Sequence, residues 1–239
     1  MFILVHGAYH SAWCWQPLIT RLQAAGHKTV APDLPGHGHI DDWIGDQDMT
    51  QYTDAIVKAL DAAASPITLV GHSMSGAVVA AAAEKRPDRV DHLVFLAAYI
   101  PVDGECVGDV VKADPASHVQ ASRIDVGGIS AIALKTGSLN NAFYNDADAE
   151  QLAWVEDRVQ LQSATPFRTP IRLSAGNFGR IGKTAIICLK DRAISPPHQR
   201  WMAERAGCHA IVDLDSGHSP FVTAPDQLCD TLTRLDFID

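Results

Sequence analysis

One six-residue segment carries the strongest chemical signal in the sequence. Gly71-His72-Ser73-Met74-Ser75-Gly76 directly follows a short apolar run and directly precedes an alanine-rich stretch of helical length. A serine on a sharp turn between a strand and a helix is presented for reaction, and only small neighbours fit beside it. Gly71, Ser75 and Gly76 meet that steric demand. We therefore predict that Ser73 is a catalytic nucleophile.

Ser75 is a rival for this role, because the usual pattern G-x-S-x-G has glycine at its position. Its hydroxyl falls in the first turn of the expected helix, where a serine typically bonds back to the preceding turn. A tight turn without any chemistry is the alternative to both. The position between strand and helix favours Ser73.

A serine hydroxyl needs a general base within hydrogen-bond reach and a third group that orients the base. Among 11 histidines, His218 lies in a loop of small residues after the last expected strand. Asp191 follows a buried strand, at the end where open α/β sheets place their working residues. Asp213 and Asp215 are alternative acids, but they stand too close to His218 along the chain to come from a separate strand end. We predict a triad of Ser73, Asp191 and His218.

Two backbone N–H groups are expected to bind the oxyanion that such a nucleophile creates. Met74 follows the nucleophile, and Ala8 lies in the loop after the first expected strand. His6 and His72 have the residue type of a base, but each is fixed in a turn and is expected to be structural. The residues expected to line the pocket are His10, Tyr99, Phe143 and Trp154.

A metal site is a competing interpretation of one other segment. His37, His39 and Asp41 match the H-x-H-x-D half of the ligand set of metallo-β-lactamases, but the next position holds Asp42 instead of His. Ligand type alone is a weak signal without a completed set of ligands. We therefore expect no metal and no cofactor.

Short apolar runs alternate with stretches of helical length, which predicts an α/β fold with a mostly parallel sheet flanked by helices. The expected strands are Phe2–Val5, Thr29–Ala31, Ile67–Val70, Val90–Ala97, Thr184–Leu189 and Ile211–Val212, and the expected helices include Gln16–Ala25, Thr50–Ala64 and Ser75–Arg86. From about 100 to 180 the strand runs disappear around helical stretches such as Asp146–Gln162. We predict a core of residues 1–99 and 181–239 and a helical cap insertion of residues 100–180.

Composition limits the function classes. The 239 residues are 47% hydrophobic and 20% charged, which fits one globular domain, and the formal net charge of -9 disfavours nucleic acid and anionic lipid as partners. The five cysteines form no CxxC pair, no apolar stretch approaches the ~18 residues of a membrane span, and no basic leader opens the chain. We expect a soluble cytoplasmic protein, with a homodimer left open.

The chain resembles the α/β-hydrolase superfamily over nearly its full length, and the order Ser73, Asp191, His218 matches that fold. Its segment His6-Gly7-Ala8-Tyr9-His10-Ser11-Ala12-Trp13-Cys14-Trp15 is similar to the H-G-A-x-H-x-A-W-x-W opening of the branch that contains plant methyl esterases and hydroxynitrile lyases. In the lyases a Thr stands at the position of Gly7 and a Lys at that of Ser219. The resemblance therefore implies an esterase-type enzyme.

The expected activity is cofactor-free hydrolysis of a small carboxylic ester through an acyl-enzyme. A lactonase or a thioesterase would use the same triad. A hydroxynitrile lyase and a non-hydrolytic ligand receptor are the alternatives from other classes.

Overall fold

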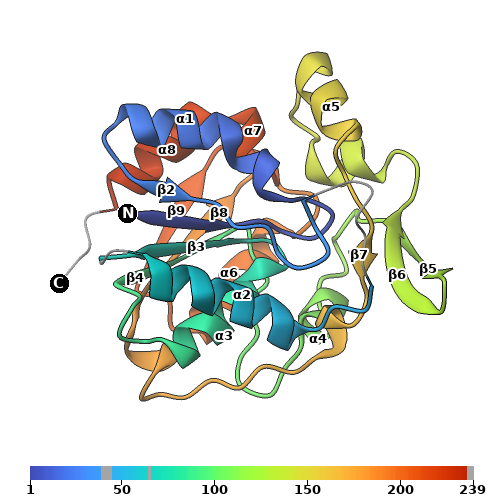
Figure 1. Cartoon of the computed structure of the whole chain (residues 1–239). Helices are drawn as coiled ribbons and strands as arrows, with labels where there is room; N and C mark the ends of the chain where they lie inside the picture. The colour runs from blue at the N-terminus through green and yellow to red at the C-terminus, as the bar shows by residue number, and fades with distance from the viewer. Residues whose placement is uncertain (39–44, 64–65, 236–239) are drawn as a thin grey trace.

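Six parallel strands form the main sheet of the computed structural model, which describes residues 1–38, 45–63 and 66–235 (Figure 1). Their order is β2-β1-β3-β4-β8-β9, and every neighbouring pair is parallel. The strands are β1 (Phe2–Val5), β2 (Thr29–Val30), β3 (Thr68–His72), β4 (His92–Leu96), β8 (Gly182–Cys188) and β9 (Ala210–Leu214). Each falls on an apolar run of the sequence, and the predicted α/β fold is confirmed.

Helices cover both faces of the sheet, which is why its central strands are apolar on both sides (Figure 1). One face carries α1 (Gln16–Ala24), α7 (Pro220–Thr223) and α8 (Pro225–Thr233), and the other carries α2 (Met49–Ala62) and α3 (Ser75–Lys85). A further helix, α6 (Pro196–Arg205), packs against β8.

The strand order reverses around β1, which pairs with β2 on one side and with β3 on the other. The chains that leave β1 and β3 therefore diverge and open a crevice at the carboxyl ends of the strands. The register pairs Val5 with Gly71 and His72 with Leu96. The sheet thus brings the loop after β1, the turn after β3 and the loop after β4 to one place.

The segment between β4 and β8 lies outside the main sheet and contains both helices and strands (Figure 1). Its elements are α4 (Val107–Lys112), β5 (Ala121–Val126), β6 (Ile129–Leu134), the π-helical turn η2 (Leu139–Phe143), α5 (Ala149–Glu156), β7 (Gln162–Ser163), and the short 3-10 turns η3 (Pro166–Arg168) and η4 (Phe178–Arg180). The strands β5, β6 and β7 form an antiparallel sheet. The expectation of a purely helical insertion is therefore incomplete, whereas its boundaries at 100 and 180 stay a prediction.

A two-glycine turn explains the hairpin of β5 and β6. Gly127 and Gly128 both adopt left-handed backbone, with φ of 63° and 88°. Two-residue hairpin loops of this kind require positive φ at both central residues, because only then does their twist match that of the flanking strands. The exposed side chains of β5 leave it without a continuous apolar run, so its strand character rests on this turn.

Within the described part of the chain, no helix combines the length and the apolar character that crossing a membrane requires.

The hairpin turn can be tested by a pair of glycine substitutions. Gly128→Ala should lower the free energy of unfolding by about 1–2 kcal/mol, because its φ is positive while no atom lies within 4 Å of the added Cβ. Gly176→Ala is the matched control, because that Cβ also meets nothing within 4 Å and the backbone there is not left-handed. It should be neutral or slightly stabilising. Urea unfolding measures both, and equal losses would contradict the backbone explanation.

Candidate active site

Ser73 occupies the sharp turn between β3 and α3 with strained backbone. Its φ of 53° lies in the left-handed region, which non-glycine residues rarely adopt. Three backbone hydrogen bonds hold the turn: Ser73 N–H donates to Leu96 O at 3.3 Å, and Ser73 O accepts from Gly76 N–H at 3.1 Å and Tyr99 N–H at 3.0 Å. The end of β4, the loop after it and the start of α3 therefore impose the conformation that presents the Ser73 side chain.

The glycines on either side of Ser73 are required by close packing. A Cβ at Gly71 would lie 2.6 Å from Val79 Cγ2, and a Cβ at Gly76 would collide with the carbonyl oxygen of Tyr99. Ser75, the rival nucleophile, is fully buried and donates its hydroxyl to the carbonyl oxygen of His6. Its bond reaches the end of β1, not the preceding turn, so its hydroxyl is already engaged.

His218 and Asp191 form a buried hydrogen-bonded pair. His218 Nδ1 lies 2.7 Å from Asp191 Oδ2, and both side chains have no solvent exposure. A carboxylate only accepts, so Nδ1 carries the hydrogen and Nε2 of the neutral ring keeps its lone pair. Nε2 has no hydrogen-bond partner among the described residues. The ring is therefore fixed in the tautomer that a general base requires.

Asp191 is held by four donors. Its Oδ1 accepts from Ala193 N–H at 2.7 Å and Ile194 N–H at 2.9 Å, and its Oδ2 accepts from Gln199 Nε2 at 2.8 Å as well as from His218. These bonds fix the carboxylate in a single orientation. Gln199 comes from α6 and was not singled out by the sequence analysis.

The histidine loop is tied to the turn that carries Ser73. His72 Nε2–H donates to the carbonyl oxygen of His218 at 3.0 Å, and the two rings lie 4.6 Å apart between centroids. Because His72 precedes Ser73, this bond brings the loop of His218 and the turn of Ser73 together. The alternative acids lie elsewhere: Asp213 pairs with Arg200 and Asp215 pairs with Lys190, on exposed surface.

Two residues between η2 and α5 contact the loop that carries His218 and the loop that carries Asp191. Asp146 Oδ2 accepts from Gly217 N–H at 2.5 Å and from the Thr223 hydroxyl at 3.2 Å. Asn145 Nδ2 donates to Lys190 O at 3.1 Å. These bonds reach the residue before His218 and the residue before Asp191. The segment between β4 and β8 thus positions both loops.

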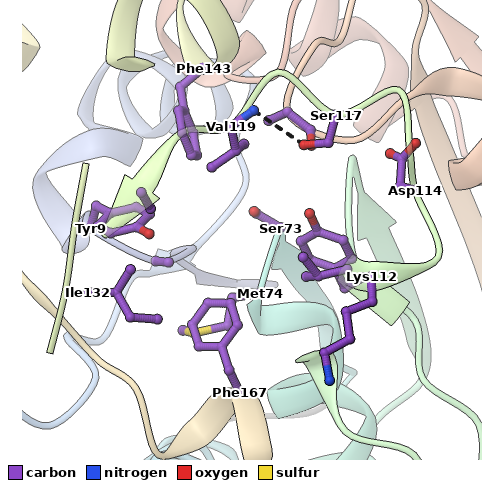
Figure 2. A pocket seen from close by; sticks show the side chains of 15 residues that line it. Tyr9, Ser73, Met74, Lys112, Asp114, Ser117, Val119, Ile132, Phe143 and Phe167 are labelled. Carbon is purple, nitrogen blue, oxygen red and sulfur yellow. Dashed lines mark hydrogen bonds between the residues drawn. The ribbon is translucent and has the colours of Figure 1, made fainter. Parts of the chain in front are cut away.

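A cavity of about 440 Å³ opens over Ser73 (Figure 2). Its lining is mostly apolar and consists of Ala8, Tyr9, Ser73, Met74, Tyr99, Val111, Lys112, Asp114, Ser117, Val119, Ala121, Ile132, Phe143, Phe167 and Ala193. The backbone N–H groups of Ala8 and Met74 have no hydrogen-bond partner among the described residues. Both predicted oxyanion donors therefore border the cavity that Ser73 lines.

Of the four residues expected to line the cavity, Tyr99 and Phe143 do so, whereas His10 and Trp154 lie outside the lining. His10 is buried behind the loop after β1, where its two ring nitrogens contact Ala8 O and the Tyr144 hydroxyl, each at 2.7 Å. Trp154 packs edge-to-face on Trp13 at 5.1 Å. The places of both side chains depend on contacts between segments far apart in the sequence, so residue type alone does not predict them.

Burial keeps a group of histidines beneath the site neutral. Desolvation lowers the pKa of His6 to about 3, of His10 to about 4 and of His37 to about 3, and it holds the pKa of His72 well below its usual value. Neutral His10 donates from Nδ1 to Ala8 O and accepts at Nε2 from Tyr144. This chain of bonds fixes the peptide between Ala8 and Tyr9, which follows the peptide of the Ala8 N–H.

The metal interpretation has little structural support in its described part. His37 Nδ1 lies 2.9 Å from His10 O and His37 Nε2 lies 3.2 Å from the Tyr52 hydroxyl, so both of its nitrogens are engaged. His39, Asp41 and Asp42 lie outside the described residues. Within residues 1–38, 45–63 and 66–235, no cluster of three or more His, Cys, Asp or Glu side chains could hold a metal ion.

Comparison with known proteins decides the family. The model of the alpha/beta hydrolase family matches residues 2–231. The chain belongs to this family.

The relatives of this α/β-hydrolase include plant and bacterial proteins. It is 30% identical to the esterase PIR7B of Oryza sativa subsp. japonica over 98% of this chain and 94% of that protein, and 27% identical to methylesterase 9 of Arabidopsis thaliana over 98% and 97%. It is 30% identical to a pyrethroid hydrolase of Sphingobium wenxiniae over 99% and 87%. The predicted resemblance to the plant methylesterase branch is confirmed.

Solved structures show the same fold. Polyneuridine aldehyde esterase superposes with a TM-score of 0.88 at 22% identity, covering 100% of this chain and 98% of that chain. A pyrethroid hydrolase from Sphingobium faniae superposes with a TM-score of 0.84 at 27% identity, covering 97% and 95%. The α/β-hydrolase fold thus extends over essentially the whole chain.

The contact between Asp146 and the histidine loop of this α/β-hydrolase can be tested directly. Asp146→Ala should lower the free energy of unfolding by about 1–3 kcal/mol, because it leaves the part-buried Gly217 N–H without its acceptor. Hydrogen exchange of the Gly217 amide should also accelerate. Asp157→Ala, at an exposed acid that follows α5, is the control and should change stability by less than ~0.5 kcal/mol. Unchanged Gly217 exchange in Asp146→Ala would contradict this role.

The buried histidines predict that the α/β-hydrolase loses stability in mild acid. Each pKa of about 3 or 4 lies below the unfolded value near 6.5, so the unfolded state binds more protons between those values. The free energy of unfolding should fall as pH drops below about 6.5, by as much as about 2 kcal/mol per histidine at pH 5. Urea titrations at pH 7 and pH 5 measure the fall. A His37→Gln variant should show a smaller fall, and an equal fall would contradict the assignment.

Proposed function

We propose that this α/β-hydrolase cleaves a small carboxylic ester through an acyl-enzyme intermediate, with Ser73 as nucleophile, His218 as general base and Asp191 as the group that orients the base. The coarser activity rests on its relatives: with an esterase, a methylesterase and a pyrethroid hydrolase among them, the chain is an ester-cleaving hydrolase. The observation that carries the finer proposal is the buried 2.7 Å bond from His218 Nδ1 to Asp191, which leaves Nε2 free.

In the proposed first half-reaction, His218 Nε2 takes the proton of the Ser73 hydroxyl while Oγ attacks the acyl carbon. The tetrahedral intermediate collapses as His218 returns that proton to the leaving alcohol oxygen. Water then attacks the acyl carbon of the ester on Ser73, and His218 takes its proton and gives it back to Ser73 Oγ. The products are the alcohol and the carboxylic acid, and no cofactor takes part.

The oxyanion of each tetrahedral intermediate is proposed to accept from the N–H groups of Ala8 and Met74. Support comes from their place beside Ser73 in the cavity lining and from their lack of other partners among the described residues. Met74 directly precedes α3, whose N-terminal dipole adds positive potential at the same spot. Removing one such donor typically costs about 10²-fold or more in kcat.

The environment of Gly7 favours ester hydrolysis over cyanohydrin cleavage. A Cβ at this position would lie 2.9 Å from both Ser73 Cβ and His72 Nδ1, so the Thr that hydroxynitrile lyases carry there does not fit this backbone. Ser219 follows His218 in place of the lyases' Lys. Lactones and thioesters would use the same residues as esters, and a substrate panel separates these three.

We infer that residues 100–180 act as a cap that sets substrate selectivity. Nine residues of this segment line the cavity: Val111, Lys112, Asp114, Ser117, Val119, Ala121, Ile132, Phe143 and Phe167. The core supplies the nucleophile and the proposed oxyanion donors, while the cap supplies most of the apolar wall. A cavity of about 440 Å³ suits a small ester.

Substitution of the two neighbouring serines tests the nucleophile. Ser73→Ala should lower the rate of hydrolysis of a p-nitrophenyl ester to a residual value, about 10³–10⁴-fold above the uncatalysed rate in water. It should also prevent labelling by a fluorophosphonate probe. Ser75→Ala is the matched control, because its hydroxyl is committed to the His6 carbonyl. It should keep both activities.

Retention of probe labelling by Ser73→Ala, or its loss only in Ser75→Ala, would overturn the assignment of Ser73.

Asp191→Asn should lower kcat strongly while the variant still binds substrate, because an amide can hold His218 in the wrong tautomer.

A further inference from the structure

Two phenol groups face the cavity without a hydrogen-bond partner. Tyr9 and Tyr99 both line it and are 5% and 6% exposed, and the hydroxyl of neither contacts a donor or acceptor among the described residues. Of the other polar side chains in the lining, Lys112 is exposed and Ser73 is the proposed nucleophile, whereas Asp114 and Ser117 are engaged. Asp114 accepts from the N–H and the hydroxyl of Ser195, and Ser117 donates to the carbonyl oxygen of Ala193.

Tyr9 is held in place by strained backbone. Its φ of 68° lies in the left-handed region, its carbonyl oxygen accepts from Gln160 N–H at 2.8 Å, and its ring packs edge-to-face on Phe143 at 5.8 Å. Figure 2 shows its hydroxyl pointing into the open space that Ser73 also faces. A strained, non-glycine residue persists only where the surrounding structure imposes it, and such residues gather at functional sites.

Tyr99 joins the same group from the other side of the nucleophile turn. Its backbone N–H donates to Ser73 O, so the position of the ring is tied to the turn itself. Burial raises the pKa of both phenols, and the charge of Asp191 adds to the rise at Tyr99. Both hydroxyls therefore stay protonated at neutral pH and can donate.

A purely hydrocarbon ligand would leave both donors unpaired, because most of the remaining wall is apolar and the side chains of Asp114 and Ser117 already have partners. An unpaired buried donor is costly, and phenylalanine would fill the same volume without that cost. A neutral oxygen acceptor satisfies the two phenols. A carboxylate fits less well beside the phenols, because the buried acid Asp114 lines the same cavity, whereas the one cation of the lining, Lys112, is exposed.

We propose that Tyr9 and Tyr99 bind a neutral oxygen acceptor, a ketone or ether oxygen, that the ester substrate carries in addition to its scissile ester group. This rests on the proposed ester hydrolysis at Ser73 and names its substrate class: small esters with a second, uncharged oxygen. The two tyrosines are specificity-determining residues and take no part in proton transfer.

Two esters that differ by one oxygen test the proposal. p-Nitrophenyl 4-oxopentanoate has a ketone where p-nitrophenyl pentanoate has a methylene, and the leaving groups are identical. The wild type should prefer the oxo ester in kcat/KM by at least about fivefold, the discrimination expected of one hydrogen bond. Tyr9→Phe and Tyr99→Phe should each reduce this preference, measured as the ratio of kcat/KM for the two esters in the same variant.

Tyr52→Phe is the matched control. Its hydroxyl is buried, contacts His37 and Gln162, and lies outside the cavity lining, so its loss should leave the preference unchanged. Equal kcat/KM for the two esters in the wild type, or a preference that neither Phe variant reduces, would overturn the proposal. Reduction in one variant only would assign the donor to that tyrosine and overturn the paired site.

The Ser73→Ala variant separates this failure from failure of the proposed function. If Ser73→Ala still hydrolyses both esters at the wild-type rate, the proposed nucleophile is wrong. The preference and its reduction in the two Phe variants are then still measured as ratios of kcat/KM, because these ratios do not depend on which residue is the nucleophile. If Ser73→Ala is inactive, calorimetric binding of the two intact esters to that variant measures the preference directly. Tighter binding of the oxo ester would support the phenol site, and equal affinity would overturn it.

Discussion

The left-handed backbone at Ser73 is the constraint on which the rest of the site depends. Holding a non-glycine residue at φ 53° requires the hydrogen bonds from Gly76 and Tyr99 to its carbonyl oxygen, and these bonds form only if α3 and the loop after β4 approach closely. Close approach in turn excludes a Cβ at Gly71 and Gly76. The alanine-rich α3 is thus a consequence of the turn, because larger side chains would separate the helix from the sheet.

Most of the framework of the protein could be predicted from the sequence because it is encoded locally. Parallel strands covered on both faces appear as continuous apolar runs, and a strand-to-helix turn around a serine shows its small residues in order. The positions of Asp191 and His218 follow from the same logic, since each lies in the loop that follows a strand. These signals need only neighbouring residues, so one sequence suffices to find them.

Other parts of the site depend on contacts between segments that lie far apart along the chain. The bond from Asp146 to Gly217 joins residues 71 positions apart, and nothing in the local pattern of either residue indicates it. His10 likewise turns to Tyr144, 134 residues away, instead of to the cavity. The hairpin is a different case, because the Gly127-Gly128 pair is itself a local turn signal. The strand before it is mainly polar, so its sequence lacks the hydrophobic pattern by which a strand is predicted.

The core and residues 100–180, the proposed cap, contribute different kinds of contact to the site, and this difference explains why the chemistry is easier to assign than the substrate. The core holds the Asp191–His218 pair through buried hydrogen bonds with fixed directions, so the tautomer follows from the geometry. The cap presents mainly apolar side chains, which limit size but hardly discriminate between hydrocarbons of similar volume. Discrimination therefore depends on the few polar groups of the cavity that the protein leaves unpaired. Tyr9 is one of these, and its hydroxyl faces the same cavity that Ala8 and Ser73 line, so a ligand that fills the cavity can contact it.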